Sequence, residues 1–277
     1  MFPFRKAGTN FAQLADFARC APHEDAIFSL LPLNDSANEI LLHQNNRWLV
    51  STIIDSRGRN SMSYGLNIGP FIQPQSTSEL ADFGRAGDII VEGDDISRCH
   101  FSFERVHNAK HNTTAVMLRD RSACMSTQTF GPKAIQFEAG RFPRRVMVSG
   151  NANLTFGFGG EACSRFKFQL VWHENARQLP QLSSSHIETP FWASTVVKTA
   201  PVTVQPARIH TPARDCRIRW LQKTVLGEGS FGKVWSAWNV DSGELFAVKV
   251  VQATCDGELQ SLKREVETLA RVSHVSE

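Results

Sequence analysis

Three glycines and a lysine near the C-terminus have the types and spacing of a phosphate-binding site. Gly227, Gly229 and Gly232 lie in the run Leu226-Gly-Glu-Gly-Ser-Phe-Gly-Lys-Val234. Lys249 lies in a later run, Phe246-Ala-Val-Lys-Val250. Because glycine has no side chain, backbone N–H groups in such a loop can approach phosphate oxygens closely. A lysine ammonium on a neighbouring strand can balance the phosphate charge. The pattern therefore predicts a nucleotide-binding hairpin.

The same glycine spacing occurs in Rossmann folds, where the loop runs from a strand into a helix. Here the residues after Gly232 continue as a β-rich run, and the turn signal Asp241-Ser-Gly-Glu244 leads into a further strand. The order strand, glycine loop, strand, turn, strand leaves no room for a helix after the loop. A glycine-rich hairpin that carries a half-buried lysine and binds nothing is the structural alternative.

This set of motifs resembles the N-terminal lobe of a protein kinase. The resemblance implies that ATP is the cofactor, that the glycine loop covers its phosphates, and that Lys249 holds the α- and β-phosphates. The ATP-binding residues that it implies are Leu226, Gly227, Glu228, Gly229, Ser230, Phe231, Gly232, Lys233, Val234, Ala247 and Lys249.

The apolar residues after Lys249 recur at helical spacing and predict a helix with one apolar face. They are Leu259, Leu262, Val266, Leu269 and Val272. Glu265 lies at the edge of that face. The kinase resemblance implies that Glu265 forms an ion pair with Lys249 and thereby supports catalysis. A solvent-exposed surface charge is the alternative for this residue.

The other kinase motifs, His-Arg-Asp, Asp-Phe-Gly and Ala-Pro-Glu, do not occur in these 277 residues. We therefore expect the chain to stop within the kinase domain and to hold no complete catalytic site. Mg²⁺ is expected only in the complete kinase, where those motifs hold it. Whether this chain is itself an enzyme stays open at this point.

Short β-rich runs separated by turn signals fill residues 26–173 and predict a β-sandwich. The expected strands are 26–31, 47–54, 89–91, 101–103, 115–118, 145–148, 154–156 and 166–171. With the kinase-like lobe added, the predicted fold class is mainly β (α+β). The predicted lobe is an antiparallel sheet with one helix.

Two motifs in the predicted sandwich, Phe83-Gly-Arg85 and Ile96-Ser-Arg-Cys-His100, resemble those of forkhead-associated (FHA) domains. The resemblance implies a phosphothreonine site made by Arg85 and Ser97, with Arg98 as a third contact and His100 bracing the loop. A guanidinium and a hydroxyl both suit phosphate oxygens. Without a ligand, Arg85 would be a solvated charge and Ser97 a turn hydroxyl bonded to its own backbone.

The segment Asp120-Arg-Ser-Ala-Cys-Met-Ser126 resembles the next FHA motif, which has an Asn-Gly pair before its last residue. The family's asparagine grips the peptide backbone, and Cys124 and Met125 replace that pair here. The resemblance therefore leaves phosphothreonine binding open. A sandwich that has lost its phosphate ligand is an alternative.

Composition predicts four segments: a leader at 1–25 that is disordered or weakly helical, the FHA-like sandwich at 26–173, a linker at 174–217, and the partial kinase domain at 218–277. The linker is rich in proline, serine and threonine and is expected to be extended and disordered.

The net charge of +3 is too small to indicate nucleic acid or a membrane as a partner. The six cysteines are scattered without a C-x-x-C pair, which favours reduced thiols in an intracellular protein of the nucleus or cytoplasm. His107 and His111 could belong to a metal site, but no third ligand is evident, so loop residues are the better interpretation and no metal is expected.

Taken together, the motifs indicate the N-terminal part of an FHA-containing serine/threonine protein kinase that resembles the checkpoint type. The expected partners are ATP, a phosphothreonine-containing protein or peptide and, in a full-length form, a protein substrate. The alternative is a non-catalytic phosphopeptide-binding adaptor that carries a remnant of a kinase lobe.

Overall fold

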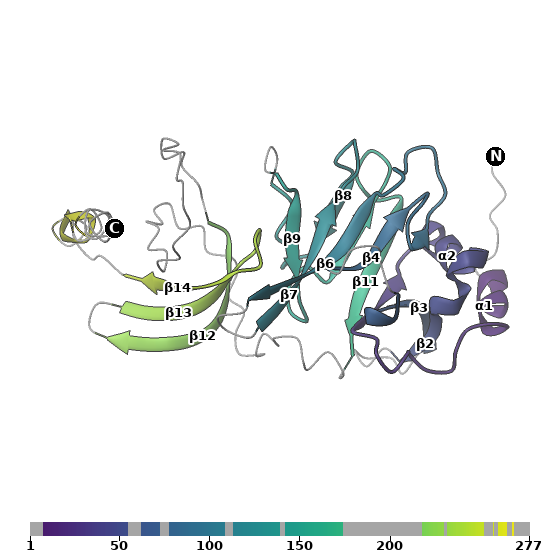
Figure 1. Cartoon of the computed structure of the whole chain (residues 1–277), viewed down its shortest axis with the longest axis horizontal. Helices are drawn as coiled ribbons and strands as arrows, with labels where there is room; N and C mark the ends of the chain where they lie inside the picture. The colour runs from purple at the N-terminus through teal and green to yellow at the C-terminus, as the bar shows by residue number, and fades with distance from the viewer. Residues whose placement is uncertain are drawn as a thin grey trace. The chain divides into compact units, whose positions relative to one another are not determined.

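The computed structural model describes residues 8–54, 62–72, 78–108, 113–138, 142–173, 218–229, 232–251, 257, 260–264 and 268. The chain divides into two compact units, one drawn mainly from residues 1–186 and the other mainly from residues 187–277. Strands make up most of both units (Figure 1). This confirms the predicted mainly-β class. The segment boundaries given above stay predictions.

The first unit contains a six-stranded antiparallel sheet in the order β2-β3-β1-β11-β10-β8. Its strands are β1 (Phe28–Pro32), β2 (Val50–Ile54), β3 (Met62–Ile68), β8 (Thr127–Phe130), β10 (Thr155–Phe158) and β11 (Phe166–Trp172). Strand β11 shows why the sequence forms this sheet. Its sequence FKFQLVW alternates apolar and polar residues, and burial alternates with it over most of its length.

The second sheet of this unit has five strands in the order β5-β4-β6-β7-β9, of which only β4 and β5 are parallel. They are β4 (Glu79–Gly84), β5 (Ile89–Ile90), β6 (Phe101–Asn108), β7 (Thr113–Asp120) and β9 (Arg145–Val148). Phe83 lies opposite Phe101, and Phe101 lies opposite Asp120. The end of β4, the start of β6 and the end of β7 are therefore aligned. This gathers the loop after β4, the loop before β6 and the loop after β7 at one end of the sheet.

Phenylalanine rings join the two sheets. Phe28 of the first sheet meets Phe103 of the second at a ring separation of 4.9 Å, and Phe101 lies 4.7 Å from Phe158. All four rings are fully buried. A tyrosine at such a position would need a partner for its hydroxyl, whereas phenylalanine fills the apolar space without one. This gives a physical reason for part of the bias of 19 Phe against one Tyr.

The first unit also contains short helices. They are α1 (Gly8–Ala15), α2 (Asp35–Leu42) and the 3₁₀ turns η1 (Gln44–Leu49) and η2 (Pro70–Ile72). Asn34 caps α2, because its side-chain oxygen accepts the N–H of Ala37 at 3.1 Å. Ala37, Ile40 and Leu41 are the buried residues of the helix. Among the residues described, no helix is long and apolar enough to cross a bilayer.

Local structure departs from the sequence expectation in several places. The sequence did not predict α2, and η1 takes residues 47–49, which we expected to be the start of a strand. Strands β3, β4 and β8 were also not predicted. Gly65 lies inside β3 and Gly84 is the last residue of β4, and a glycine weakens the strand pattern of each run. Packing in the folded sheets overrides that weak local preference.

The second unit has an antiparallel sheet in the order β12-β13-β14. Its strands are β12 (Trp220–Gly229), β13 (Gly232–Asn239) and β14 (Leu245–Val250), drawn in green and yellow in Figure 1. Residues 260–264 are helical. The strand, glycine loop, strand, turn, strand order that the motifs predict is therefore the order observed.

Candidate functional site

The glycine hairpin and the predicted lysine share one row across the three-stranded sheet. Gly227 of β12 lies opposite Val234 of β13, and Val234 lies opposite Lys249 of β14. Residues directly opposite one another in antiparallel strands project to the same face. Lys249 is exposed. The fold therefore brings the lysine to the face of the sheet that carries the first glycine of the loop.

The three glycines differ in what the rest of the chain requires of them. A Cβ atom added to Gly227 or Gly229 would meet nothing within 4 Å. Gly232, in contrast, has a φ of +125°, and a Cβ there would overlap the carbonyl oxygen of Val250. The chain's own packing therefore explains the third glycine only. The first two leave the backbone open to a ligand.

This difference predicts opposite outcomes for two alanine substitutions. Gly232→Ala should destabilise the β12–β14 sheet by about 1 to 3 kcal/mol, because alanine is strained at positive φ. Gly229→Ala should leave its stability unchanged or raise it by up to about 1 kcal/mol. Amide hydrogen exchange of β12–β14 in the whole chain measures both effects. Equal destabilisation by the two variants would mean that hairpin packing requires both glycines.

In the first unit, the turn after β4 packs closely against the loop that precedes β6. A Cβ on Gly84 would lie 2.7 Å from the carbonyl oxygen of Ser97 and would overlap that of Arg98. The N–H of Arg85 donates to the Ser97 carbonyl at 3.1 Å, and the N–H of Ala86 donates to the Arg98 carbonyl at 2.9 Å. The glycine of the Gly-Arg motif thus allows the contact that brings Arg85 beside Ser97.

These two loops carry two exposed arginines. The side chains of Arg85 and Arg98 are exposed and make no hydrogen bond or ion pair within the part of the chain that the structure describes. The Ser97 hydroxyl accepts the N–H of Ala123, from the loop after β7, at 3.4 Å. Two guanidinium groups and a hydroxyl at one sheet end can bind a doubly charged phosphate by charge-assisted hydrogen bonds.

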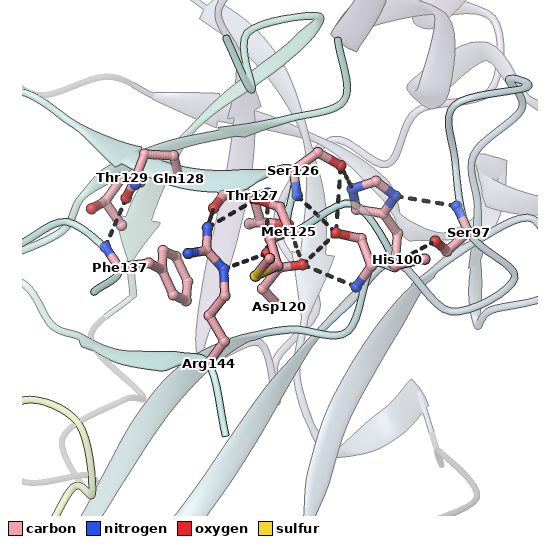
Figure 2. A network of polar contacts seen from close by, with 12 residues as sticks. Ser97, His100, Asp120, Met125, Ser126, Thr127, Gln128, Thr129, Phe137 and Arg144 are labelled. Atoms are coloured by element: carbon pink, nitrogen blue, oxygen red, sulfur yellow. Dashed lines mark hydrogen bonds and ion pairs between the residues drawn. The ribbon is translucent and has the colours of Figure 1, made fainter. Parts of the chain in front are cut away.

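His100 lies between Ser126 and the Ser97 loop and is hydrogen-bonded to both (Figure 2). Its ring Nδ1 accepts the N–H of Ser97 at 3.2 Å, and its Nε2 lies 3.1 Å from Oγ of Ser126. Because Nδ1 accepts, the neutral ring carries its proton on Nε2 and donates to Ser126. Burial lowers the pKa of His100, although the Asp120 carboxylate acts in the opposite direction. The histidine is therefore a neutral brace.

Asp120, at the end of β7, organises the loop that follows it. Its Oδ1 accepts the N–H of Ser122 at 3.0 Å and the Ser122 hydroxyl at 2.7 Å. Its Oδ2 accepts Nε of Arg144 at 2.8 Å and the N–H of Thr127 at 3.3 Å. The Ser122 hydroxyl in turn accepts the N–H of Ser126 at 2.8 Å. A continuous polar network thus runs from Arg144 to Ser97 (Figure 2).

The carboxylates of Asp82 and Asp88 hold together the two ends of the turn that contains Arg85. The N–H of Asp82 donates to Oδ2 of Asp88 at 3.0 Å, and the N–H of Asp88 donates to Oδ1 of Asp82 at 2.6 Å. Burial, aided by the neighbouring Asp82 charge, raises the pKa of Asp88 from 3.8 to about 6. The native state therefore binds this proton more strongly than the unfolded state does.

It follows that Asp88 lowers the stability of the unit as the pH rises from about 4 to about 6. Since Asp88 is only partly buried, solvent screening limits the effect to about 1 kcal/mol. The free energy of unfolding of wild type minus that of Asp88→Asn should therefore fall by this amount between pH 4.5 and pH 7. Parallel pH profiles of the two proteins would contradict the assignment.

Comparison with known proteins links the chain to protein kinases. Mitogen-activated protein kinase kinase kinase 2 of Arabidopsis thaliana is 40% identical over 65 residues, which are 21% of this chain and 10% of that protein. Kinase kinase kinase 3 of the same plant is 33% identical over 85 residues, 28% of this chain and 12% of that protein. MAP kinase kinase kinase mkh1 of Schizosaccharomyces pombe is 30% identical over 80 residues. Part of this chain is kinase-related.

These matches cover only a small part of each relative. The mkh1 match covers 28% of this chain and 7% of the yeast protein, so the chain spans about a tenth of the length of these relatives. No protein-family model matches the chain. The FHA domain and the checkpoint-type resemblance therefore stay predictions.

Some predicted site residues lie outside the described part of the chain. Ser230 and Phe231 of the glycine loop, Glu265 of the predicted helix and His111 are among them. The Lys249–Glu265 ion pair thus stays a prediction. Within the described residues, no cluster of His, Cys, Asp or Glu could hold a metal ion. The hydroxyl of Thr114 lies 3.2 Å from Nδ1 of His107.

The sequence analysis did not identify Arg144 or the central role of Asp120. Nothing in the run Arg141-Phe-Pro-Arg-Arg145 marks Arg144 as different from its neighbours. Only the fold brings it to Asp120 from the segment just before β9. The one available signal was the aspartate at the start of the Asp120–Ser126 motif.

Proposed function

We propose that this chain is the N-terminal part of an FHA-containing serine/threonine protein kinase. In this proposal the β12–β13 hairpin and Lys249 bind ATP. The loops that carry Arg85 and Ser97 bind a phosphothreonine peptide. Docking through this phosphothreonine site raises the local concentration of the kinase near its partner.

The observation that carries the ATP site is the cross-strand row of Gly227, Val234 and Lys249, together with the open space over Gly227 and Gly229. In the proposed complex, N–H groups of the glycine loop contact the phosphates and the Lys249 ammonium contacts the α- and β-phosphates. Ala247 and Lys249 alternate with more buried residues of β14 and share one face. Ala247 and Val234 then supply an apolar surface for the base.

Two further residues support the hairpin itself. Glu228 lies opposite Lys233, and the Lys233 ammonium is 3.2 Å from the Glu228 carboxylate. Both side chains are largely exposed, so the pair adds little stability. Its expected role is to keep the two strands in register beside the glycines.

Titration of the whole chain with a fluorescent ATP analogue tests this site. Lys249→Met should weaken binding about tenfold, because one charge-assisted contact to the phosphates is lost. Lys223→Met is the matched control, since Lys223 lies on β12 with its ammonium 5.1 Å from the Trp238 ring. The control should bind like wild type. Equal affinity of wild type and Lys249→Met would contradict the ATP site.

The phosphothreonine site rests on the two exposed arginines, Arg85 and Arg98, and on the hydroxyl of Ser97, which precedes Arg98 in the same loop. A phosphate group presents three acceptor oxygens, which match one hydroxyl and two guanidinium donors. In an adaptor without kinase activity only this second site would bind a ligand. The ATP titration therefore separates the kinase proposal from the adaptor.

A further inference from the structure

Arg144 has an environment that suits a fixed rather than a solvated guanidinium. Its side chain is 10% exposed, and Nε donates to Oδ2 of Asp120 at 2.8 Å. Nη2 donates to the carbonyl oxygens of Met125 at 3.0 Å and Thr127 at 2.8 Å. The guanidinium carbon lies 4.9 Å from the centre of the Phe137 ring. One side chain therefore holds both ends of the loop after β7.

The backbone conformation of this loop needs contacts from residues outside the loop to stabilise it. Met125 has a φ of +51°, a conformation that is unfavourable for a residue with a side chain. The loop residues on either side of Met125 lead directly to the candidate phosphate site. Ser126 contacts His100, which holds the N–H of Ser97, and the Ala123 N–H donates to the Ser97 hydroxyl.

We propose that Arg144 is a positioning residue for phosphothreonine recognition, which fixes the 121–126 loop and through it the Ser97 hydroxyl. This inference rests on the phosphothreonine site proposed above. Arg144 acts through the loop, because its Nε and Nη2 donate to Asp120, Met125 and Thr127 and its side chain is only 10% exposed. Lysine keeps the charge at this position but cannot reproduce the planar fork that reaches all three acceptors.

The test compares Arg144→Lys with Arg119→Lys in the whole chain. Arg119 forms an ion pair with Glu104 at 2.9 Å on β6 and β7 and, among the described residues, has no hydrogen bond or ion pair with the loop. The probe is the phosphothreonine peptide that binds wild type best from a degenerate library. Arg144→Lys should weaken its binding about tenfold, and Arg119→Lys should change it less than twofold. The ring nitrogen shifts of His100 should move in Arg144→Lys only.

A rescue variant separates positioning from a general loss of stability. Glycine adopts a φ of +51° without strain, so Met125→Gly in the Arg144→Lys background should restore at least threefold of the lost affinity. No rescue, or an equal loss in Arg119→Lys, would overturn the positioning role. If Arg144→Lys does not fold, Phe137→Leu replaces it. That change removes the aromatic ring that packs against the Arg144 guanidinium and leaves the Arg144–Asp120 ion pair. Phe137→Leu should then give a smaller loss in the same direction, and unchanged binding would overturn the role.

Arg85→Ala serves as the reference arm. If wild type binds the peptide, Arg85→Ala does not, and Arg144→Lys binds like wild type, the positioning role falls and the phosphothreonine site stands. If wild type binds no member of the library, both fall together.

Discussion

Asp120→Ala is expected to lower the free energy of unfolding of the first unit by about 3 to 5 kcal/mol, the range for breaking a buried ion pair from one side. The Asp120 side chain is 1% exposed and that of Arg144 is 10% exposed. Removing the carboxylate leaves the Arg144 guanidinium largely desolvated beside only neutral acceptors. The hydrogen bonds to Ser122 and Thr127 are lost as well. Urea denaturation followed by far-ultraviolet circular dichroism measures the loss.

Glu104→Ala is the matched control for this prediction. Glu104 of β6 pairs with Arg119 of β7 at 2.9 Å, but the Arg119 side chain is 40% exposed. Arg119 can therefore regain water when its partner is removed, and the expected loss is about 1 kcal/mol. If Asp120→Ala cost no more than Glu104→Ala, the network around Asp120 would not be the stabilising centre of this loop.

Arg85→Ala should reduce the affinity for a phosphothreonine peptide about 30-fold, which corresponds to about 2 kcal/mol for a charge-assisted contact to phosphate. Its stability should stay within about 0.5 kcal/mol of wild type, because the exposed side chain has no described partner. Isothermal titration with the peptide and with its unphosphorylated form measures the effect.

Arg47→Ala provides the control for the loss of one surface arginine. Arg47 is exposed in η1, with its guanidinium 4.9 Å from the centre of the Phe17 ring, and among the described residues it has no hydrogen bond or ion pair with the loops that carry Arg85 and Ser97. It should bind the peptide like wild type. An equal loss in both variants would indicate a general charge effect, and no loss in Arg85→Ala would remove this arginine from the proposed site.

The sequence predicted most strands of the first unit because short β-rich runs between turn signals indicate strands. Strand β9 was expected at 145–148 and is observed there. Helix α2 was not expected, since its run DSANEILL is short and its stability comes from burying Ile40 and Leu41. The register that aligns Phe83, Phe101 and Asp120 is a long-range property that no local pattern contains.

For the sites, motif spacing identified residues that the fold does bring together. The N–H of Arg85 bonds the carbonyl of Ser97, and Val234 connects Gly227 to Lys249 across the sheet. Arg144 could not be found in this way, because its role depends on where β7 ends relative to the segment before β9. Local motifs thus indicated the groups of the proposed sites and missed Arg144, the group that holds one of their loops in place.

The most direct test of the proposed phosphothreonine site is an amide-resolved titration of the ¹⁵N-labelled chain with the phosphothreonine peptide that binds wild type best. The account predicts that chemical-shift changes concentrate at residues 85–86, 97–98 and 121–126 and disappear when the peptide carries unmodified threonine. Changes confined to other surfaces, or equal changes with the unmodified peptide, would contradict it.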